Sequence, residues 1–417
     1  MNKWVSKGIG GAVLLSLLLG TVAASADDRE SVETNEVTVE SGQTLPSSGS
    51  VQFSDVGADH WAKAAIQMAV SKGYVSGYPG GKFKPEQAIT RGEFIKMVVT
   101  ALGLPTEAVE GVWYEPYVKV AQNQSLYAAV DFANNEEQWN KDITRQEMAR
   151  IAVRAIGQAT SENDKWMYLA TKSGLITGLG KGVLGEDKTT TRAQSVTIIE
   201  RILEVNAGET LPVDKYAVSN AELAWHGTNI FTVMPEILVS DESELKGRSV
   251  EELWNEEMMT ITSKDGKYKA QLEALIAIDM EDPNDPNWKL LPPVGELKWF
   301  DGYFEHTDLK ITDWPQSYLL VTKSKVIFNK DKKKYNSEVN FAVSGFNSPR
   351  LSKRKFDPIV LDSSADVYHY KLYDIPVLIV PKKGWVVDRH GIEISLQTPS
   401  TSNYMSQYIL EIYPPEI

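Results

Sequence analysis

One short construction occurs three times in this sequence, and it constrains the fold more than any other feature. At Thr90, Thr144 and Thr191, a threonine is followed by an arginine and, two residues later, by a glutamate or glutamine, and an apolar run begins next. In such a capping box the hydroxyl accepts from the N–H of the third helical residue, and the Glu or Gln side chain accepts from the threonine N–H. Each occurrence predicts the start of a helix, and the repetition predicts three copies of one unit.

The helices predicted after these caps have matching faces. Their mainly apolar residues recur at i, i+3, i+4, i+7 and i+8, the spacing that lines one side of a helix. The three faces are Phe94, Met97, Val98, Ala101 and Leu102; Met148, Ile151, Ala152, Ala155 and Ile156; and Ser195, Ile198, Ile199, Ile202 and Leu203. We therefore predict three repeats, at about residues 51–104, 105–157 and 158–205, that bury these faces against one another.

The first 26 residues have the pattern of an export signal. Lys3 and Lys7 precede an apolar stretch, and Ala24-Ser25-Ala26 has the small residues that signal peptidase recognises. The apolar stretch is shorter than the roughly 18 residues of a membrane-spanning helix. We expect a signal peptide at 1–26, with an uncleaved anchor as the alternative, a disordered spacer at 27–50, and no membrane span after cleavage.

Composition narrows the class of protein further. A chain of 417 residues has room for two or more domains. The formal net charge of -13 argues against a nucleic-acid partner, which requires a basic face. The chain has no cysteine, which excludes disulfides, thiolate zinc sites and a lipid-modified N-terminal cysteine.

Residues 51–205 resemble the S-layer-homology family. In the first repeat the resemblance is close and rests on Phe53-Ser54-Asp55-Val56, His60-Trp61-Ala62, Gly73 to Pro79 and Ile89 to Phe94. The third repeat is similar, and the second matches mainly through Trp113, Tyr117 and Ile143 to Glu147. The resemblance implies an all-α pseudo-trimer, with three repeats around a central three-helix bundle. It also implies an extracellular location at the cell wall or S-layer, with pyruvylated secondary cell-wall polysaccharide bound between the repeats and a surface-layer protein as a further candidate partner.

The arginines of the three capping boxes are the leading binding candidates. An arginine at the first helical position opposes the helix dipole by roughly 0.3–1 kcal/mol. A bound carboxylate would gain the free N–H groups of that turn and a bidentate guanidinium pair. The alternative is that these side chains point into water or pair with nearby glutamates. The predicted polysaccharide-binding residues are Arg91, Arg145, Arg192, Thr90, Thr144, Thr191, Gly77, Tyr78, Gly81 and Gly178.

The repeats depart from the family pattern in ways that predict unequal grooves. The family commonly has Asp at the position of Gly80, and the middle loop, Ala128 to Asp142, lacks the Gly-Tyr pair. In the third repeat Leu179 replaces an aromatic residue and Gln194 replaces the acidic capping residue. We expect the groove built around Arg91 to bind best. The alternative role of Gly77 and Gly81 is that of ordinary turn residues. Tyr78 is expected either to stack on a sugar ring or to pack the loop.

The rest of the chain is predicted to be a linker at 206–224 and a β-rich domain at 225–417, either a sandwich or a barrel. Tyr318 to Phe328 and Tyr335 to Val343 flank a polar turn and are predicted to form a hairpin. Further strands are expected at 376–380, 392–396 and 408–413, and a short helix after Ser249. Lys330 and Lys332 to Lys334 predict a solvated turn, with contact to anionic wall polymer as the alternative.

No known catalytic motif is found in the sequence. His226, His306, His369 and His390 are dispersed, so neither a metal site nor a cofactor is expected. Two functions stay open: a non-enzymatic module attached to the wall, or a tethered extracellular hydrolase with its active site in the C-terminal domain, whose two carboxylates come from distant positions. Because the sequence has none of these catalytic motifs, the non-enzymatic module is favoured.

Overall fold

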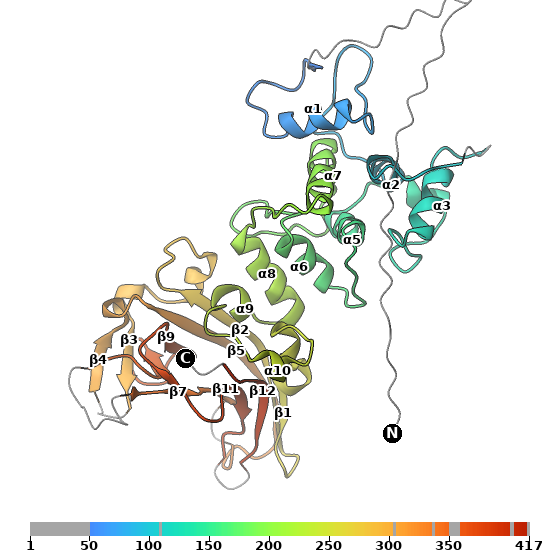
Figure 1. Ribbon diagram of the computed structural model, residues 1–417. Coiled ribbons are helices and arrows are strands. Elements are labelled where there is room, and N and C mark those ends of the chain that lie inside the picture. The colour runs from blue at the N-terminus through green and yellow to red at the C-terminus, as the bar shows by residue number, and fades with distance from the viewer. Residues whose placement is uncertain are drawn as a thin grey trace, which may run out of the picture. The chain divides into compact units, whose positions relative to one another are not determined.

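The computed structural model describes residues 51–107, 111–302, 306–335, 338–349, 359–400 and 404–414. The predicted signal peptide and spacer lie outside these residues. Helices dominate the first part of the described chain, and antiparallel strands dominate the second (Figure 1). This division agrees with the predicted multidomain layout.

Each repeat contains an outer helix followed by a capped helix. The helices are α1 (Lys63–Ser71) and α2 (Arg91–Ala101); α3 (Glu115–Asn123), the short α4 (Glu136–Trp139) and α5 (Arg145–Ala155); and α6 (Lys165–Lys172) and α7 (Arg192–Asn206). All three predicted capping boxes are confirmed, with the hydroxyls of Thr90, Thr144 and Thr191 accepting at 3.2, 3.2 and 3.3 Å. Local sequence therefore determines where the capped helices begin.

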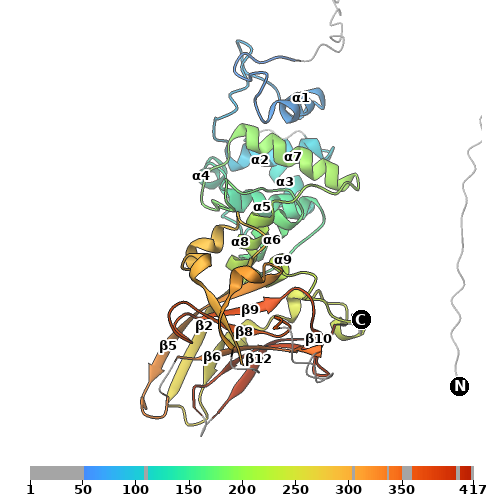
Figure 2. The same ribbon diagram turned by 90° about the vertical axis from the view of Figure 1, so that its left-hand side faces the viewer.

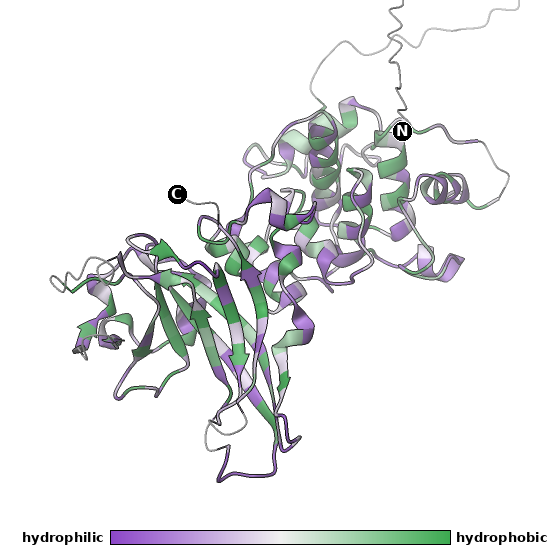
Figure 3. Ribbon diagram, turned by 60° about the horizontal axis from the view of Figure 1, so that its bottom comes forward, coloured by the Kyte–Doolittle hydropathy of each residue, from purple (hydrophilic) through white to green (hydrophobic). Residues whose placement is uncertain are grey.

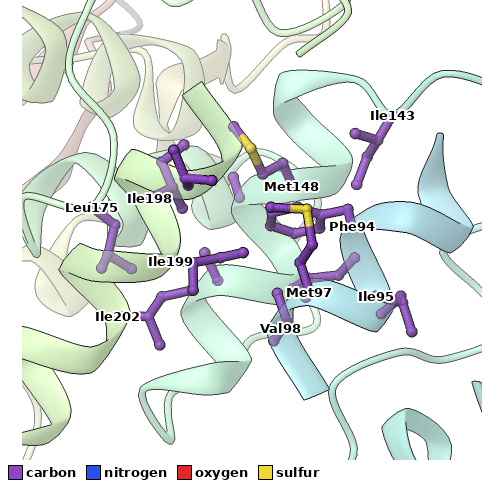
Figure 4. Packing of buried hydrophobic residues seen from close by; sticks show 14 of the residues in the cluster. Phe94, Ile95, Met97, Val98, Ile143, Met148, Leu175, Ile198, Ile199 and Ile202 are labelled. Carbon is purple, nitrogen blue, oxygen red and sulfur yellow. The ribbon is translucent and has the colours of Figure 1, made fainter. Parts of the chain in front are cut away.

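The capped helices α2, α5 and α7 bury their predicted faces in one core. Phe94, Met97 and Val98 of α2, Met148 of α5, and Ile198, Ile199 and Ile202 of α7 converge there (Figure 4). On the ribbon coloured by hydropathy, hydrophobic and hydrophilic stretches share these helices (Figure 3). Because the apolar faces are matched, the three helices exclude water from a common centre.

Backbone hydrogen bonds join the three repeats in a closed cycle. The residues directly before the capping threonines take part: Ile89 N–H donates to Thr190 O (3.2 Å), Thr190 N–H to Ile143 O (2.9 Å), and Ile143 N–H to Ile89 O (3.0 Å). The outer helices pack accordingly, α3 on α2, α6 on α5, and α1 on α7. The first repeat is thus in direct contact with the third.

The segment predicted as a linker contains a helix, α8 (Lys215–His226). Asp214 caps it by accepting from the N–H groups of Tyr216 and Ala217 at 3.1 and 3.2 Å. Val218, Ala221 and Trp225 belong to the core of the repeats, whereas Leu223 packs against a core of the β-rich part. The helix therefore contacts both cores. Two short helices follow, α9 (Ile230–Val233) and α10 (Glu242–Leu245).

The β-rich part contains a seven-stranded sheet in the order β1-β2-β5-β9-β8-β3-β4, a three-stranded sheet β12-β11-β6, and the pair β10-β7. Figure 2 shows strands of this part gathered in one region, among them β2, β5, β9 and β12. Side chains of β2, β5, β6, β11 and β12 share one buried core, so the two larger sheets face each other as in a sandwich. The strands are β1 (Thr260–Thr262), β2 (Tyr268–Asp279), β3 (Lys298–Asp301), β4 (His306–Lys310), β5 (Ser317–Asn329), β6 (Asn340–Ser344), β7 (Phe346–Asn347), β8 (Ala365–Tyr368), β9 (Val377–Pro381), β10 (Val386–Val387), β11 (Ile392–Gln397) and β12 (Ser406–Ile412).

The predicted hairpin between residues 318–328 and 335–343 is wrong. Strand β5 pairs with β2 and β9, whereas β6 pairs with β11 in the other sheet. After β5 the chain turns, and Tyr335 stacks on Tyr268 of β2 with ring centroids 5.0 Å apart. Alternating polarity reveals a strand but not its partner. The short helix predicted after Ser249 is a 3₁₀ turn, Glu251–Leu253.

Candidate functional site

The three arginines of the capping boxes occupy equivalent, buried positions. Arg91, Arg145 and Arg192 are the first residues of α2, α5 and α7, and only 8, 4 and 8 % of their surfaces are exposed. Each side chain reaches into the loop of another repeat: Arg192 into the first, Arg91 into the second, and Arg145 into the third. Each candidate groove is therefore built by more than one repeat.

Two of the arginines are held by backbone carbonyls. Arg192 Nε donates to Phe83 O at 3.0 Å and its Nη2 donates to Ser76 O. Arg145 makes the same contacts in its own groove, to Leu184 O and Thr177 O, both at 2.8 Å. Within the described part of the chain, neither guanidinium forms an ion pair with a carboxylate. Burial lowers the pKa of both arginines, because desolvation disfavours the charged form.

The remaining arginine, Arg91, is neutralised by a carboxylate. Arg91 donates from Nε and Nη2 to the two carboxylate oxygens of Glu147, at 2.9 and 2.5 Å. Its Nη1 donates to the backbone and side-chain oxygens of Gln138, at 3.0 and 2.7 Å. The ring centroid of Phe132 lies 4.3 Å from the guanidinium carbon. Every nitrogen of this guanidinium thus already has a protein partner.

A cavity of about 470 Å³ opens beside Arg192. Its walls include Tyr74 to Ser76 of the first repeat, Lys96 of α2, and Trp113 and Tyr117 of the second repeat. The Lys96 Nζ atom is 5.8 and 5.6 Å from the ring centroids of Trp113 and Tyr117, and 48 % of the Trp113 surface is exposed. Glu93 also lines the cavity, where its carboxylate accepts from Thr90 N–H at 2.8 Å.

This cavity combines two cations with an exposed aromatic wall. Cations pair with an acidic group, and an indole packs against the apolar face of a sugar ring. The arrangement therefore suits an acidic saccharide. Lys96 was not predicted from sequence as a contact, and Trp113 and Tyr117 were noted only as residues of the family pattern. The available signal was Lys96 itself, a cation on the same helix as Arg91.

The other predicted binding residues have structural contacts of their own or lie beside a different arginine from the one in their repeat. The three threonine hydroxyls are engaged in capping. Tyr78 lies beside Arg192, with 4.9 Å between the guanidinium carbon and the ring centroid, and not beside Arg91. A Cβ at Gly77 would lie 2.3 Å from the Phe53 ring, so packing alone requires glycine there. Gly81 has a φ of 68°, and the Gly178 N–H donates to Asp214 at 3.0 Å. The structure therefore groups the Gly-Tyr loop of the first repeat with Arg192.

Comparison with known proteins identifies the first repeat. The family model "S-layer homology domain" matches residues 52–95. The chain contains an S-layer homology domain. This domain implies anchoring at the cell surface, and together with the S-layer relatives it indicates an extracellular location at the cell wall or S-layer. No helix among the described residues has both the length and the apolar character needed to cross a membrane.

The relatives of this S-layer homology domain protein are much longer chains. The S-layer protein sap of Bacillus anthracis is 29 % identical over 172 residues, which are 36 % of this chain and 21 % of the relative. Exoglucanase XynX of Acetivibrio thermocellus is 29 % identical over 182 residues, 37 % of this chain and 16 % of the relative. Amylopullulanase of Thermoanaerobacterium thermosulfurigenes is 28 % identical over 179 residues, which are 36 % of this chain and 9 % of the relative. The chain thus spans about a fifth or less of these relatives.

Proposed function

We propose that this protein is anchored to the cell wall by pyruvylated secondary cell-wall polysaccharide, which binds in grooves between the repeats, and that it displays the β-rich part at the surface. The observation that carries the proposal is the Arg192 guanidinium, which is buried beside an open cavity. Among the described residues it donates hydrogen bonds only to carbonyl groups, and it packs against the rings of Tyr78 and Phe83. Lys96 is the second cation of this site.

The electrostatics of Arg192 favour an anionic ligand. Carbonyl dipoles compensate a buried charge only partly, and an uncompensated buried ion is strongly unfavourable. Among the described residues, Nη1 of Arg192 has no hydrogen-bond partner, whereas Nε and Nη2 are occupied. The Glu93 carboxylate lines the same cavity and attracts Arg192 without a hydrogen bond to it. A pyruvyl carboxylate bound at Nη1 would add a direct charge-assisted pair, while Trp113 packs against the sugar ring. Burial would make this pair stronger than one in open solvent.

The repeats form a pseudo-trimer in this proposal, and the hydrogen-bond cycle through Ile89, Ile143 and Thr190 supports it. The grooves are unequal, but in an order that differs from the one expected from sequence. The Arg192 groove ranks first because the cavity of about 470 Å³ opens beside this arginine. Arg145 has the same carbonyl contacts and ranks second. Arg91 ranks last, because Glu147 already neutralises it.

Calorimetric titration tests the proposal. Fragments of pyruvylated wall polysaccharide are titrated into the full chain and into Arg192→Ala, with the same fragments after removal of pyruvate as the ligand control. Arg389→Ala, which changes an exposed arginine of the β-rich part, is the matched protein control. We expect binding that requires both pyruvate and Arg192. Equal affinity for the two forms of the polysaccharide would contradict the proposal.

A tethered glycoside hydrolase is the second candidate, and one observation favours it. A cleft of about 580 Å³ includes Glu162 and Glu252, whose carboxylates are both 3.5 Å from Lys165 Nζ and so lie no more than about 7 Å apart. Paired carboxylates of glycosidases are separated by roughly 5–9.5 Å. If the chain releases reducing ends from wall polysaccharide, Glu162→Gln and Glu252→Gln should each abolish the release. No release by the intact chain would reject this candidate.

A further inference from the structure

Two turns of the β-rich part bring six lysines together. Lys264 and Lys267 lie in the turn between β1 and β2, and Lys330 and Lys332 to Lys334 lie in the turn after β5. The turns are neighbours, because Lys330 N–H donates to Lys267 O at 2.8 Å and β2 pairs with β5 up to Tyr268 and Asn329. We call this pair of turns the lysine tip.

The lysine tip is only partly neutralised. Lys334 pairs with Asp265 at 2.7 Å, and Lys267 with Asp331 at 3.3 Å. Within the described residues, Lys264, Lys330, Lys332 and Lys333 form no ion pair, and all four are exposed. Six lysines together with Asp265, Asp331 and the nearby Glu338 give the tip a formal charge of +3 in a chain whose net charge is -13. Lys330 Nζ lies 4.8 Å from the Phe328 ring centroid.

Ring stacking and hydrogen bonds fix the backbone of the two turns that form the lysine tip. Tyr335 stacks on Tyr268, and its hydroxyl donates to Asp265 at 2.8 Å. The Asn329 side chain donates to Tyr335 O at 2.7 Å, and the hydroxyl of Ser263 donates to Asp265 at 2.8 Å. Folding has therefore already ordered the backbone that presents the lysines, so a partner does not have to order it.

We propose that the lysine tip is a second contact surface for the acidic polysaccharide of the cell wall, separate from the grooves of the repeats. Four unpaired like charges on adjacent turns repel one another, and a polyanion would relieve that repulsion. The contact surface is a pair of exposed turns, so it selects for density of negative charge and not for the shape of one sugar. A linear chain that bears many carboxylates meets this requirement. Only the choice of wall polysaccharide as the polyanion rests on the proposed function.

The test compares two variants of the full chain with the same change in charge. K264Q/K330Q/K332Q/K333Q removes the unpaired lysines of the tip. K289Q/K310Q/K371Q/K383Q removes four exposed lysines elsewhere in the β-rich part and is the matched control. Binding to purified pyruvylated wall polysaccharide is measured at low and high NaCl. We expect the tip variant to bind roughly ten-fold more weakly at low salt, with the difference lost near 1 M NaCl because contacts with a polyanion are screened.

The outcomes separate this inference from the proposed function. If the tip variant binds like the control variant, the inference is overturned whether or not Arg192 matters. If the tip variant binds more weakly and Arg192→Ala binds normally, the inference about the lysine tip is supported and the groove proposal fails. Self-association of the intact chain at low salt, lost in the tip variant without any change in polysaccharide binding, would instead assign the tip to a second copy and overturn the inference. Melting curves of both variants verify that they fold.

Discussion

The grooves at Arg91 and Arg192 begin from the same sequence construction and end in opposite electrostatic states. In both, an arginine follows a capping threonine, starts a helix and is buried. Glu147 pairs with Arg91 through both carboxylate oxygens, whereas Arg192 contacts two carbonyls and faces a cavity. The residue that decides the difference comes from another repeat. A motif therefore locates an arginine but does not tell whether its charge is available to a ligand.

The largest effect is expected when all grooves are removed together. Deletion of residues 51–205 should shift most of the protein from the wall fraction to the culture medium, because the repeats supply the grooves. Cell fractionation measures the distribution, and near-UV circular dichroism verifies that the β-rich part stays folded. Retention at the level of the intact protein would assign anchoring to the β-rich part.

Arg91→Ala should lower the stability of the repeats and change their affinity for polysaccharide little. The change leaves the Glu147 carboxylate, only 14 % exposed, without its cation. We expect the unfolding transition of the repeats to lose about 3 kcal/mol, with little change in polysaccharide affinity. Denaturant unfolding measures the loss, and Arg91→Leu combined with Glu147→Gln should recover part of it. Weaker binding at unchanged stability would restore Arg91 as the leading ligand contact.

Arg192→Ala should have the opposite profile. A charge-assisted contact of about 1.5–3 kcal/mol corresponds to roughly a ten- to hundred-fold loss of affinity. Stability should change less than in Arg91→Ala, because the change leaves the carbonyls of Phe83 and Ser76 without a donor but breaks no hydrogen-bonded ion pair. Calorimetric titration and melting curves measure the two quantities on the same sample. A larger loss of affinity in Arg145→Ala would reverse the order of these two grooves.

The Lys172–Glu251 ion pair should make the stability of the protein depend on pH under acid conditions. Burial raises the pKa of Glu251, but the hydrogen bond and the charge of Lys172, together with hydrogen bonds from the Glu251 backbone and from Ser249, outweigh burial and lower the pKa to about 2. Because the folded-state pKa lies below the ordinary value, the stabilisation is present above about pH 4.5 and is lost as the pH falls through 2. Lys172 is half exposed, so we expect a loss of only about 2 kcal/mol. Lys172→Met should remove most of this pH dependence in unfolding measurements between pH 5 and pH 2.

The smallest effect is expected at the caps, where the repeats are alike. Thr90→Ala, Thr144→Ala and Thr191→Ala should each cost about 1 kcal/mol of stability, and Thr→Ser much less. Polysaccharide affinity should be unchanged, because the hydroxyls already accept from backbone N–H groups. If one of these variants binds more weakly without losing stability, its threonine belongs to the ligand site.

The features that were predictable from sequence are local ones. A capping box and an apolar face are set within one or two helical turns, so the starts of α2, α5 and α7 were predicted correctly. The partners of β5 and β6 lie far away in the chain, and the predicted hairpin was therefore wrong. For the same reason, the alternative in which an arginine pairs with a glutamate could be stated from sequence, but not that the pair is Arg91 with Glu147, and the closeness of Tyr78 to Arg192 was not predicted. Both depend on how separate repeats pack.

The hydrogen-bond cycle through Ile89, Thr190 and Ile143 also bears on how this part of the chain folds. In an open solenoid each repeat contacts only its sequence neighbours, so units can be gained or lost at the ends. Here the first repeat closes on the third, and the last bond of the cycle requires that about a hundred residues of intervening chain form a loop first. Loop closure over such a distance slows folding and couples the units. The repeats should therefore fold and unfold together.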